Sequence, residues 1–276
     1  MKTRVLTGVS VLVPVLYLIG WAPPWLFMAA LAALVQGGLY EFFHISREAG
    51  MKPYPALGYA AGAVVCLAQW LDLQDRGGLA LVAVALACLL ILAVGVWHSR
   101  ELTNYSASVA ITVLGVVYVA FNLSCLFPLR FSSFGSTFAS GRQLLFFLIA
   151  VIVAGDIFAY LTGRLAGRRF MFPRVSPKKT FEGAVGGLAA SVISGWIYAR
   201  WFWRTNDWKL VIPLALCIAL AGQAGDLVES ALKRSANLKD SGVILPGHGG
   251  LLDRIDSMLF ASPALWLALE LRNILH

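Results

Sequence analysis

The sequence predicts an all-α fold: a polytopic membrane helical bundle with about nine transmembrane helices. Hydrophobic residues make up 59% of the 276 residues and charged residues only 13%, whereas soluble domains are about 45–50% apolar and about 25% charged. Apolar runs of about 20 residues, the length needed to cross a bilayer, recur along the whole chain. In residues 1–150 the charges lie in the loops between these runs. A soluble fold could not bury this much apolar surface, but a bilayer can accommodate it.

The apolar runs are expected to form the helices in order, at about 5–20, 22–40, 54–72, 79–97, 107–128, 143–161, 181–202, 210–230 and 257–275. The first run follows Lys2 and Arg4, as in a signal peptide, but no small-residue cleavage site comes after it. We therefore expect it to remain as an uncleaved anchor. Residues 1–150 are expected to form an N-terminal scaffold of transmembrane helices, because they are mostly Leu, Ala, Val and aromatics, whereas residues 151–256 carry acids, lysines and glycines among apolar stretches.

Basic residues predict the orientation of the chain. Most of the 22 Lys and Arg residues lie at the N-terminus and in alternate loops, and cytoplasmic loops carry this excess in membrane proteins. The N-terminus and the loops before the seventh and ninth spans are thus predicted to be cytoplasmic, and the C-terminus to lie outside. This rule explains the net charge of +8 without a nucleic-acid partner. We expect a multi-pass protein of the bacterial inner membrane.

A polar stripe is predicted on the eighth span. Asp226, Glu229, Ser230 and Lys233 are spaced i, i+3, i+4 and i+7, which places them on one helix face. An acid at the centre of a membrane helix costs about 2.5–3.5 kcal/mol, so such acids indicate a polar cavity, an ion path or a metal site. Hard carboxylate oxygens suit Mg²⁺, and the lysine suits a phosphate. Upstream, Asp156 belongs to a second polar helix face.

A glycine-rich turn follows the stripe. Gly249 and Gly250 come directly after His248, and such glycines allow exposed amides to approach phosphate oxygens. Asp253 and Asp256 then open the last helix. Acids are ordinary at a helix N-terminus, where they act as caps. Capping would account for the presence of one Asp but hardly for both, so we expect a functional role for the pair.

The loop after the sixth span supplies further hydroxyl and ammonium groups, at Ser176, Lys179 and Thr180. The loop also contains four arginines, for which anchoring to anionic lipid headgroups is the alternative interpretation: Arg164, Arg168, Arg169 and Arg174.

Together these residues resemble a known family. The pattern from Ser230 to Asp256 resembles the signature of the phosphatidate cytidylyltransferases, also called CDP-diacylglycerol synthases, over its whole length; its fixed positions are Ser230, Leu232, Lys233, Arg234, Lys239, Asp240, Gly242, Leu245, Pro246, His248, Gly249, Gly250, Asp253, Arg254 and Asp256. The segment from Ser176 to Gly183 is similar to a second conserved loop of that family. The hydrophobic N-terminal half agrees with the family only in character.

The resemblance implies an enzyme that transfers CMP from CTP to phosphatidate, releasing pyrophosphate and forming CDP-diacylglycerol for phospholipid biosynthesis. It implies a Mg²⁺-dependent nucleotidyltransferase with one or two metal ions, contact with membrane lipid and a homodimer. The metal ligands carried over are Asp226, Asp253 and Asp256, which with Lys233 form the expected catalytic set. The expected substrate contacts are Ser176, Lys179, Thr180, Ser230, Arg234, Lys239, Asp240, His248, Gly249, Gly250 and Arg254.

The chemistry of the residues agrees with this reaction. Nucleotidyl transfer requires charge neutralisation and in-line positioning more than an acid–base pair. The phosphate of phosphatidate is already anionic, so His248 is expected to contact phosphate or to support the loop rather than to act as a base. Residues 151–276 are accordingly expected to be the C-terminal catalytic region, with its site at the cytoplasmic face.

Other functions remain open at this point. A transporter would also contain intramembrane acids and broken helices, but it has no evident need for the glycine–histidine turn beside clustered lysines. A CTP-dependent lipid kinase would release CDP instead of pyrophosphate. The sequence pattern of CDP-alcohol phosphotransferases is absent, and a pure scaffold would not need so many costly acids.

Overall fold

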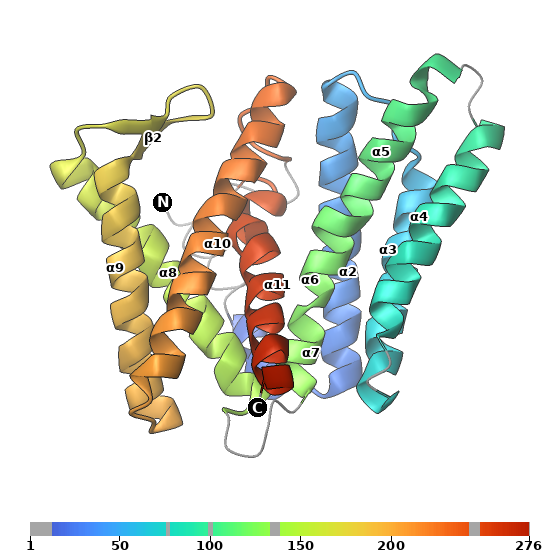
Figure 1. The fold of residues 1–276 in the computed structure, drawn as a ribbon. Helices are drawn as coiled ribbons and strands as arrows, with labels where there is room; N and C mark the ends of the chain where they lie inside the picture. Colours follow the sequence, from blue (N-terminus) through green and yellow to red (C-terminus); the bar gives the residue numbers. More distant parts are fainter. Residues whose placement is uncertain (1–12, 76–77, 99–101, 133–138, 243–248, 276) are drawn as a thin grey trace. The chain divides into compact units, whose positions relative to one another are not determined.

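The structure, a computed structural model, describes residues 13–75, 78–98, 102–132, 139–242 and 249–275. In these ranges the ordered elements are helices, apart from one two-stranded hairpin (Figure 1). The all-α prediction is therefore confirmed. The chain forms two compact units, Met1–Phe131 with Leu232–Ile255, and Ser132–Ala231 with Asp256–His276. The functional division near residue 150 stays a prediction.

The first unit contains the N-terminal helices, α2 (Pro24–Glu48), α3 (Pro55–Asp75), α4 (Leu79–His98), α5 (Tyr105–Gly115), a π-helical turn (Val116–Phe121), α6 (Asn122–Ser124) and α7 (Leu126–Phe131). Pro24 starts α2, because its fixed φ suits the first turn and its missing N–H is not needed there. The helix ends at Glu48, shortly before Gly50, which takes a φ of 82°. Large side chains fill the interior of the unit, among them Phe42, Phe43 and Phe127.

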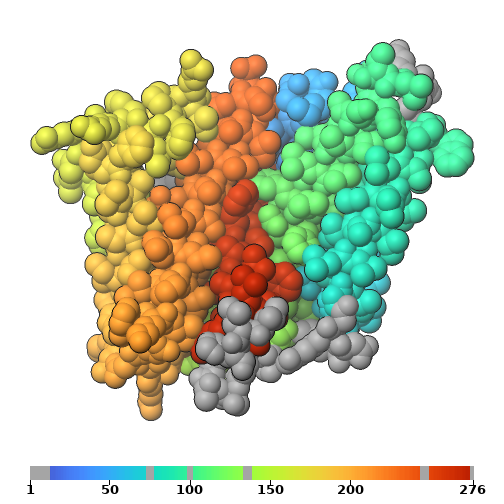
Figure 2. Space-filling view, in the orientation of Figure 1, coloured from blue at the N-terminus to red at the C-terminus, as the bar shows by residue number. Residues whose placement is uncertain are grey.

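Helix α4 presents an apolar surface, drawn in teal in Figure 2. Leu81, Val82, Leu86, Leu89 and Leu90 are all more than half exposed. Its opposite side packs on α3 and α5 through small residues such as Ala83 and Ala87. Exposed aliphatic side chains along one helix are suited to contact with acyl chains.

The second unit contains α8 (Gly141–Ala166), strands β1 (Phe170–Phe172) and β2 (Ser176–Thr180), α9 (Phe181–Tyr198) and a π-helical turn (Ala199–Trp203). Helices α10 (Trp208–Ser235) and α11 (Leu252–Leu275) contribute residues to both units. β1 and β2 pair antiparallel, and the yellow hairpin projects from the ends of α8 and α9 in Figures 1 and 2. The sequence predicted this segment only as a loop.

Helices α8 and α9 pack closely through small residues. The buried positions of α9 repeat every four residues, at Gly183, Gly187, Ser191 and Gly195. An added Cβ at Gly187 would lie 2.8 Å from the carbonyl oxygen of Gly155 on α8, so only a glycine permits this approach. Small residues at this spacing allow the backbones of membrane helices to come together without large side chains between them.

Most of the predicted spans agree with helices, but their number is not confirmed. Each predicted run from the second to the ninth lies on a helix, while the first lies partly outside the described residues. Within the described part of the chain, five helices are long and apolar enough to cross a membrane: Pro24–Glu48, Leu79–Trp97, Leu102–Phe131, Gly141–Ala166 and Trp208–Ser235. Helix α10 extends to Ser235, beyond the apolar run predicted at 210–230, so Lys233 is helical, as the polar stripe predicted.

Candidate active site

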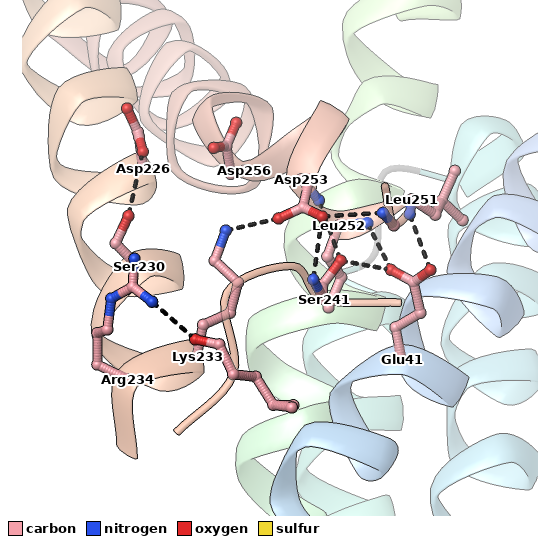
Figure 3. A network of polar contacts seen from close by, with 12 residues as sticks. Glu41, Asp226, Ser230, Lys233, Arg234, Ser241, Leu251, Leu252, Asp253 and Asp256 are labelled. Carbon is pink, nitrogen blue, oxygen red and sulfur yellow. Dashed lines mark hydrogen bonds and ion pairs between the residues drawn. The ribbon is translucent and has the colours of Figure 1, made fainter. Parts of the chain in front are cut away.

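Asp253 lies at the centre of a polar network in the first unit (Figure 3). It is in the first turn of α11. Its Oδ1 accepts a hydrogen bond from the Lys233 ammonium at 2.5 Å, and its Oδ2 accepts from the backbone N–H groups of Ser241 at 3.0 Å and Gly250 at 2.8 Å. Lys233 comes from the last turns of α10. The network thus joins the two helices that flank the glycine-rich turn.

The carboxyl of Asp253 is stabilised in its charged form. Burial by itself raises the pKa of this group, but the hydrogen bonds from Lys233, Ser241 and Gly250 outweigh burial and hold the pKa at about 2. Only 12% of each side chain of the Lys233–Asp253 pair is exposed. Asp253 is therefore a fixed anion at every physiological pH, as a cation ligand or a partner for a phosphate-binding lysine must be.

Glu41 is part of this network and was missed by the sequence analysis. It lies on α2, is only 1% exposed, and accepts hydrogen bonds from Ser241 Oγ, the Leu251 N–H and the Leu252 N–H, each at 2.8 Å. It was overlooked because it lies in the N-terminal part, 200 residues from Ser241 in the sequence. An acid directly after the second predicted span, with Phe42 and Phe43 following it, was the available signal.

In the second unit, Asp226 pairs with a lysine of the hairpin. Lys179 Nζ, from β2, lies 2.5 Å from Asp226 Oδ2 on α10, and Ser230 Oγ lies 3.5 Å from Asp226 Oδ1 one turn further on. Both members of the ion pair remain about one third exposed. Asp156 on α8 interacts electrostatically with both of them. Asp156, the acid of the predicted second polar helix face, thus interacts with the Lys179–Asp226 pair.

Asp256 lies at a close approach of α10 and α11. An added Cβ at Gly225 would stand 2.5 Å from the carbonyl oxygen of Asp256, whereas one at Gly222 would be 3.6 Å from Ser257 Cβ. Gly225 directly precedes Asp226, so the two predicted metal ligands of this unit occupy neighbouring positions at one helix crossing (Figure 3). The Asp256 carboxylate accepts a hydrogen bond from the Ser257 N–H at 2.6 Å.

The predicted loop contacts have different placements. Thr180 is buried and caps α9, with its side chain accepting a hydrogen bond from the Gly183 N–H at 3.1 Å. Ser176 begins β2 and is partly exposed. The carboxylate of Glu182 accepts hydrogen bonds from the backbone N–H groups of Arg168 and Arg169. The Thr180 cap and the Glu182 carboxylate fix the start of α9. Strand β2, which leads into this helix, carries Lys179 to its ion pair with Asp226.

The other predicted residues lie near these clusters or outside the described residues. Arg234, Lys239, Asp240 and Arg254 are exposed, and Arg234 Nη1 donates to the Leu238 carbonyl oxygen at 2.9 Å. Gly249 takes a φ of 82°, which explains why a glycine is required there. Gly250 donates to Asp253, as described above. Glu229, predicted on the polar stripe, is fully buried, and His248 lies outside the described residues.

The donor chemistry is compatible with Mg²⁺. Among the residues that the structure describes, no three His, Cys, Asp or Glu side chains form a metal-ligand group. Mg²⁺ usually takes only one or two carboxylates and completes its octahedron with water and substrate phosphates, and Asp226 and Asp253 each carry a carboxylate of the type it uses. Asp253 belongs to one compact unit and Asp226 and Asp256 to the other, so their sharing of one cation stays a prediction.

The fold and the polar clusters define a helical membrane protein whose paired lysines and carboxylates are suited to phosphate groups. The sequence model of the Cytidylyltransferase family matches residues 2–272, so the chain belongs to this family. It is accordingly an enzyme of the class that transfers CMP from CTP.

Curated relatives cover most of the chain. The phosphatidate cytidylyltransferase of Bacillus subtilis is 31% identical over 274 residues, which are 98% of both chains. The phosphatidate cytidylyltransferase of Brucella abortus is 39% identical over 194 residues, 70% of this chain and 66% of the relative. That of Staphylococcus haemolyticus is 38% identical over 157 residues, 56% of this chain and 57% of the relative.

Proposed function

We propose that this chain is a phosphatidate cytidylyltransferase, which forms CDP-diacylglycerol and pyrophosphate from CTP and phosphatidate. One observation carries the proposal. The relative from Bacillus subtilis that bears this name aligns with 98% of this chain at 31% identity, and the alignment therefore includes the segments that hold Lys179, Asp226, Lys233 and Asp253.

The side chains of this chain fit the reaction. An oxygen of the phosphatidate phosphate attacks the α-phosphorus of CTP, and the bond from that phosphorus to the bridging oxygen of the β-phosphate breaks. No proton has to be removed from the nucleophile, so the site needs cations and fixed geometry instead of a general base. Lys233 and Lys179 supply two ammonium groups, each held at 2.5 Å by a carboxylate. These pairs orient the lysines before substrate binds, which lowers the reorganisation needed during reaction.

We also propose Mg²⁺ as the cofactor, with Asp226, Asp253 and Asp256 as its ligands. When bound, Mg²⁺ would neutralise phosphate charge and polarise the reacting phosphoryl group. Asp253 is suited to this role for two reasons. Its pKa of about 2 keeps the carboxyl ionised, and its Oδ1 retains a lone pair in addition to the one that accepts the Lys233 hydrogen bond.

Two labelled forms of CTP test the reaction. With purified protein, phosphatidate and Mg²⁺, label in the α-phosphate of CTP is expected to enter lipid, and label in the γ-phosphate is expected to leave as pyrophosphate. In a parallel reaction that supplies a polyprenol or similar lipid alcohol, entry of the γ-label into lipid would instead identify a lipid kinase. If neither label enters lipid, the proposed function is wrong. Chelation with EDTA is expected to stop turnover, and added Mg²⁺ to restore it.

Membrane location and assembly belong to the same proposal. We propose a multi-pass protein of the bacterial cytoplasmic membrane that acts as a homodimer, with the N-terminus and the site facing the cytoplasm, where CTP is dissolved. A reporter fused after His276 is expected outside the cytoplasm, because the nine spans predicted from the sequence would place the two ends on opposite sides. Native mass spectrometry in detergent tests the dimer: a predominantly monomeric but fully active enzyme would remove it.

A further inference from the structure

We infer that Glu41, on helix α2, is a positioning residue for the reaction, because it fixes the turn that holds Asp253. The inference rests on the proposed function for its catalytic part. It gives the N-terminal helices a role beyond that of a scaffold, since one of their side chains helps to shape the catalytic segment.

The surroundings of Glu41 consist of hydrogen-bond donors. Its Oε1 accepts from the Leu251 N–H, and its Oε2 accepts from the Leu252 N–H and from Ser241 Oγ, all at 2.8 Å. The side chain is 1% exposed, so little water is available to replace these bonds. The two amides lie at the start of α11, where backbone N–H groups lack partners within the helix. Glu41 therefore caps α11 from another helix.

Ser241 connects Glu41 to Asp253. Its hydroxyl donates to Glu41 and is positioned to accept from the backbone N–H of Asp253 at 3.4 Å, while its own N–H donates to Asp253 Oδ2 at 3.0 Å. Glu41 thus holds both the residue that binds the Asp253 carboxylate and the helix turn that carries Asp253 (Figure 3).

The glycines of the turn leave room for this carboxylate. An added Cβ at Gly242 would lie 2.6 Å from Glu41 Oε1, and one at Gly250 would lie 2.6 Å from Glu41 Oε2. Both contacts are closer than real Cβ atoms tolerate. Glycine is therefore needed at both positions to leave space for the Glu41 side chain. This need is separate from any close approach of the turn to a substrate phosphate.

A glutamine cannot reproduce the arrangement. Glutamine has the same shape as glutamate, but its amide presents one acceptor oxygen and one NH₂ donor. In either orientation the NH₂ group faces a donor, the Leu251 N–H at one oxygen position or the Leu252 N–H at the other. Glu41→Gln therefore breaks at least one cap bond while changing the volume of the core very little.

The test compares three variants of the full-length protein in detergent. Glu41→Gln removes the carboxylate, and Ser241→Ala removes the hydroxyl from the other end of the same hydrogen bond. Glu48→Gln is the matched control, because Glu48 ends the same helix with its side chain 53% exposed. Each variant is assayed for kcat and KM with CTP and phosphatidate, for thermal unfolding, and for hydrogen exchange of the Leu251 and Leu252 amides.

We expect Glu41→Gln and Ser241→Ala each to lower kcat about tenfold, the lower end of what is typical for residues that orient a functional group. Both KM values are expected to stay within about twofold of the wild-type values, and Glu48→Gln to behave as wild type. The Leu251 and Leu252 amides are expected to exchange faster in Glu41→Gln. A kcat that stays unchanged while these amides exchange faster would leave Glu41 a purely structural role and overturn the inference.

Unchanged exchange of both amides in a folded Glu41→Gln protein would also overturn it. If that variant does not fold, the kcat of Ser241→Ala decides by the same criterion. A wild-type protein that makes no CDP-diacylglycerol would refute the proposed function, whereas the exchange experiment would still report whether Glu41 holds the turn.

Discussion

Replacement of Asp253 by asparagine is expected to lower both stability and activity, and the structure gives the size of the first effect. The pKa of Asp253 falls from 3.8 to about 2, and one pKa unit corresponds to about 1.4 kcal/mol. The charged carboxylate therefore stabilises the folded state by about 2 kcal/mol at neutral pH. Burial of the Lys233–Asp253 pair, with 12% of each side chain exposed, means that solvent screens little of this energy.

The sign of the pH dependence follows from the lowered pKa. A group that is more acidic in the folded state contributes its full stabilisation above its unfolded pKa of 3.8 and loses it as the pH falls toward about 2. The difference in unfolding temperature between wild type and Asp253→Asn should thus be constant from about pH 8 to pH 5 and shrink below about pH 4. Asp207→Asn, an exposed Asp-to-Asn change before α10, serves as the control.

Two assays check the prediction. Thermal unfolding in detergent measures the stability difference, and incorporation of CTP label into lipid measures turnover, which we expect to fall at least about 100-fold. A difference in unfolding temperature that widens toward acid pH would contradict the assigned charge state of Asp253. Full activity of a folded Asp253→Asn protein would remove this residue from the catalytic set.

Two further changes test the second unit. Lys179→Met removes the ammonium that pairs with Asp226 at 2.5 Å, and turnover is expected to fall at least about tenfold; unchanged kcat and KM for both substrates would show that the pair has no role in the reaction. Gly225→Ala directs a Cβ at the carbonyl oxygen of Asp256, 2.5 Å away, whereas Gly222→Ala meets its nearest atom at an ordinary 3.6 Å. Gly225→Ala is therefore expected to lower the unfolding temperature and turnover, and Gly222→Ala to be neutral or stabilising, because alanine is the better helix former by about 1 kcal/mol. Equal effects of the two alanines would contradict the close helix crossing.

Several elements were predictable because their signals are local. Helices α4 and α8 follow from continuous apolar runs. The face shared by Asp226 and Ser230 follows from their spacing of four residues, and their side chains do meet. In each case residues close in the sequence determine the geometry, so a pattern of the right period is sufficient.

The hairpin was not predictable in this way, and the apolar run by itself gives too short a length for α10. Three- and five-residue strands are too short for an alternating pattern to stand out from a loop. The apolar run at 210–230 ends before α10 does, because Lys233 and Arg234 are charged but are good helix formers in its last turn; the polar stripe, not hydropathy, predicted that Lys233 is helical. Hydropathy reports where a bilayer can be crossed, not where helical hydrogen bonding ends.

The sequence by itself determined that this is a helical membrane protein of the cytidylyltransferase family, because composition, apolar length and the fixed polar positions from 230 to 256 are properties of the chain as written. Only the tertiary structure decided which charges meet: Lys179 with Asp226, Lys233 with Asp253, and Glu41 with the turn at Ser241. The physical reason is that a carboxylate in a folded protein can accept hydrogen bonds only from the donor groups that tertiary packing places beside it. Packing is decided by contacts between distant segments, for which the linear sequence carries no local signal.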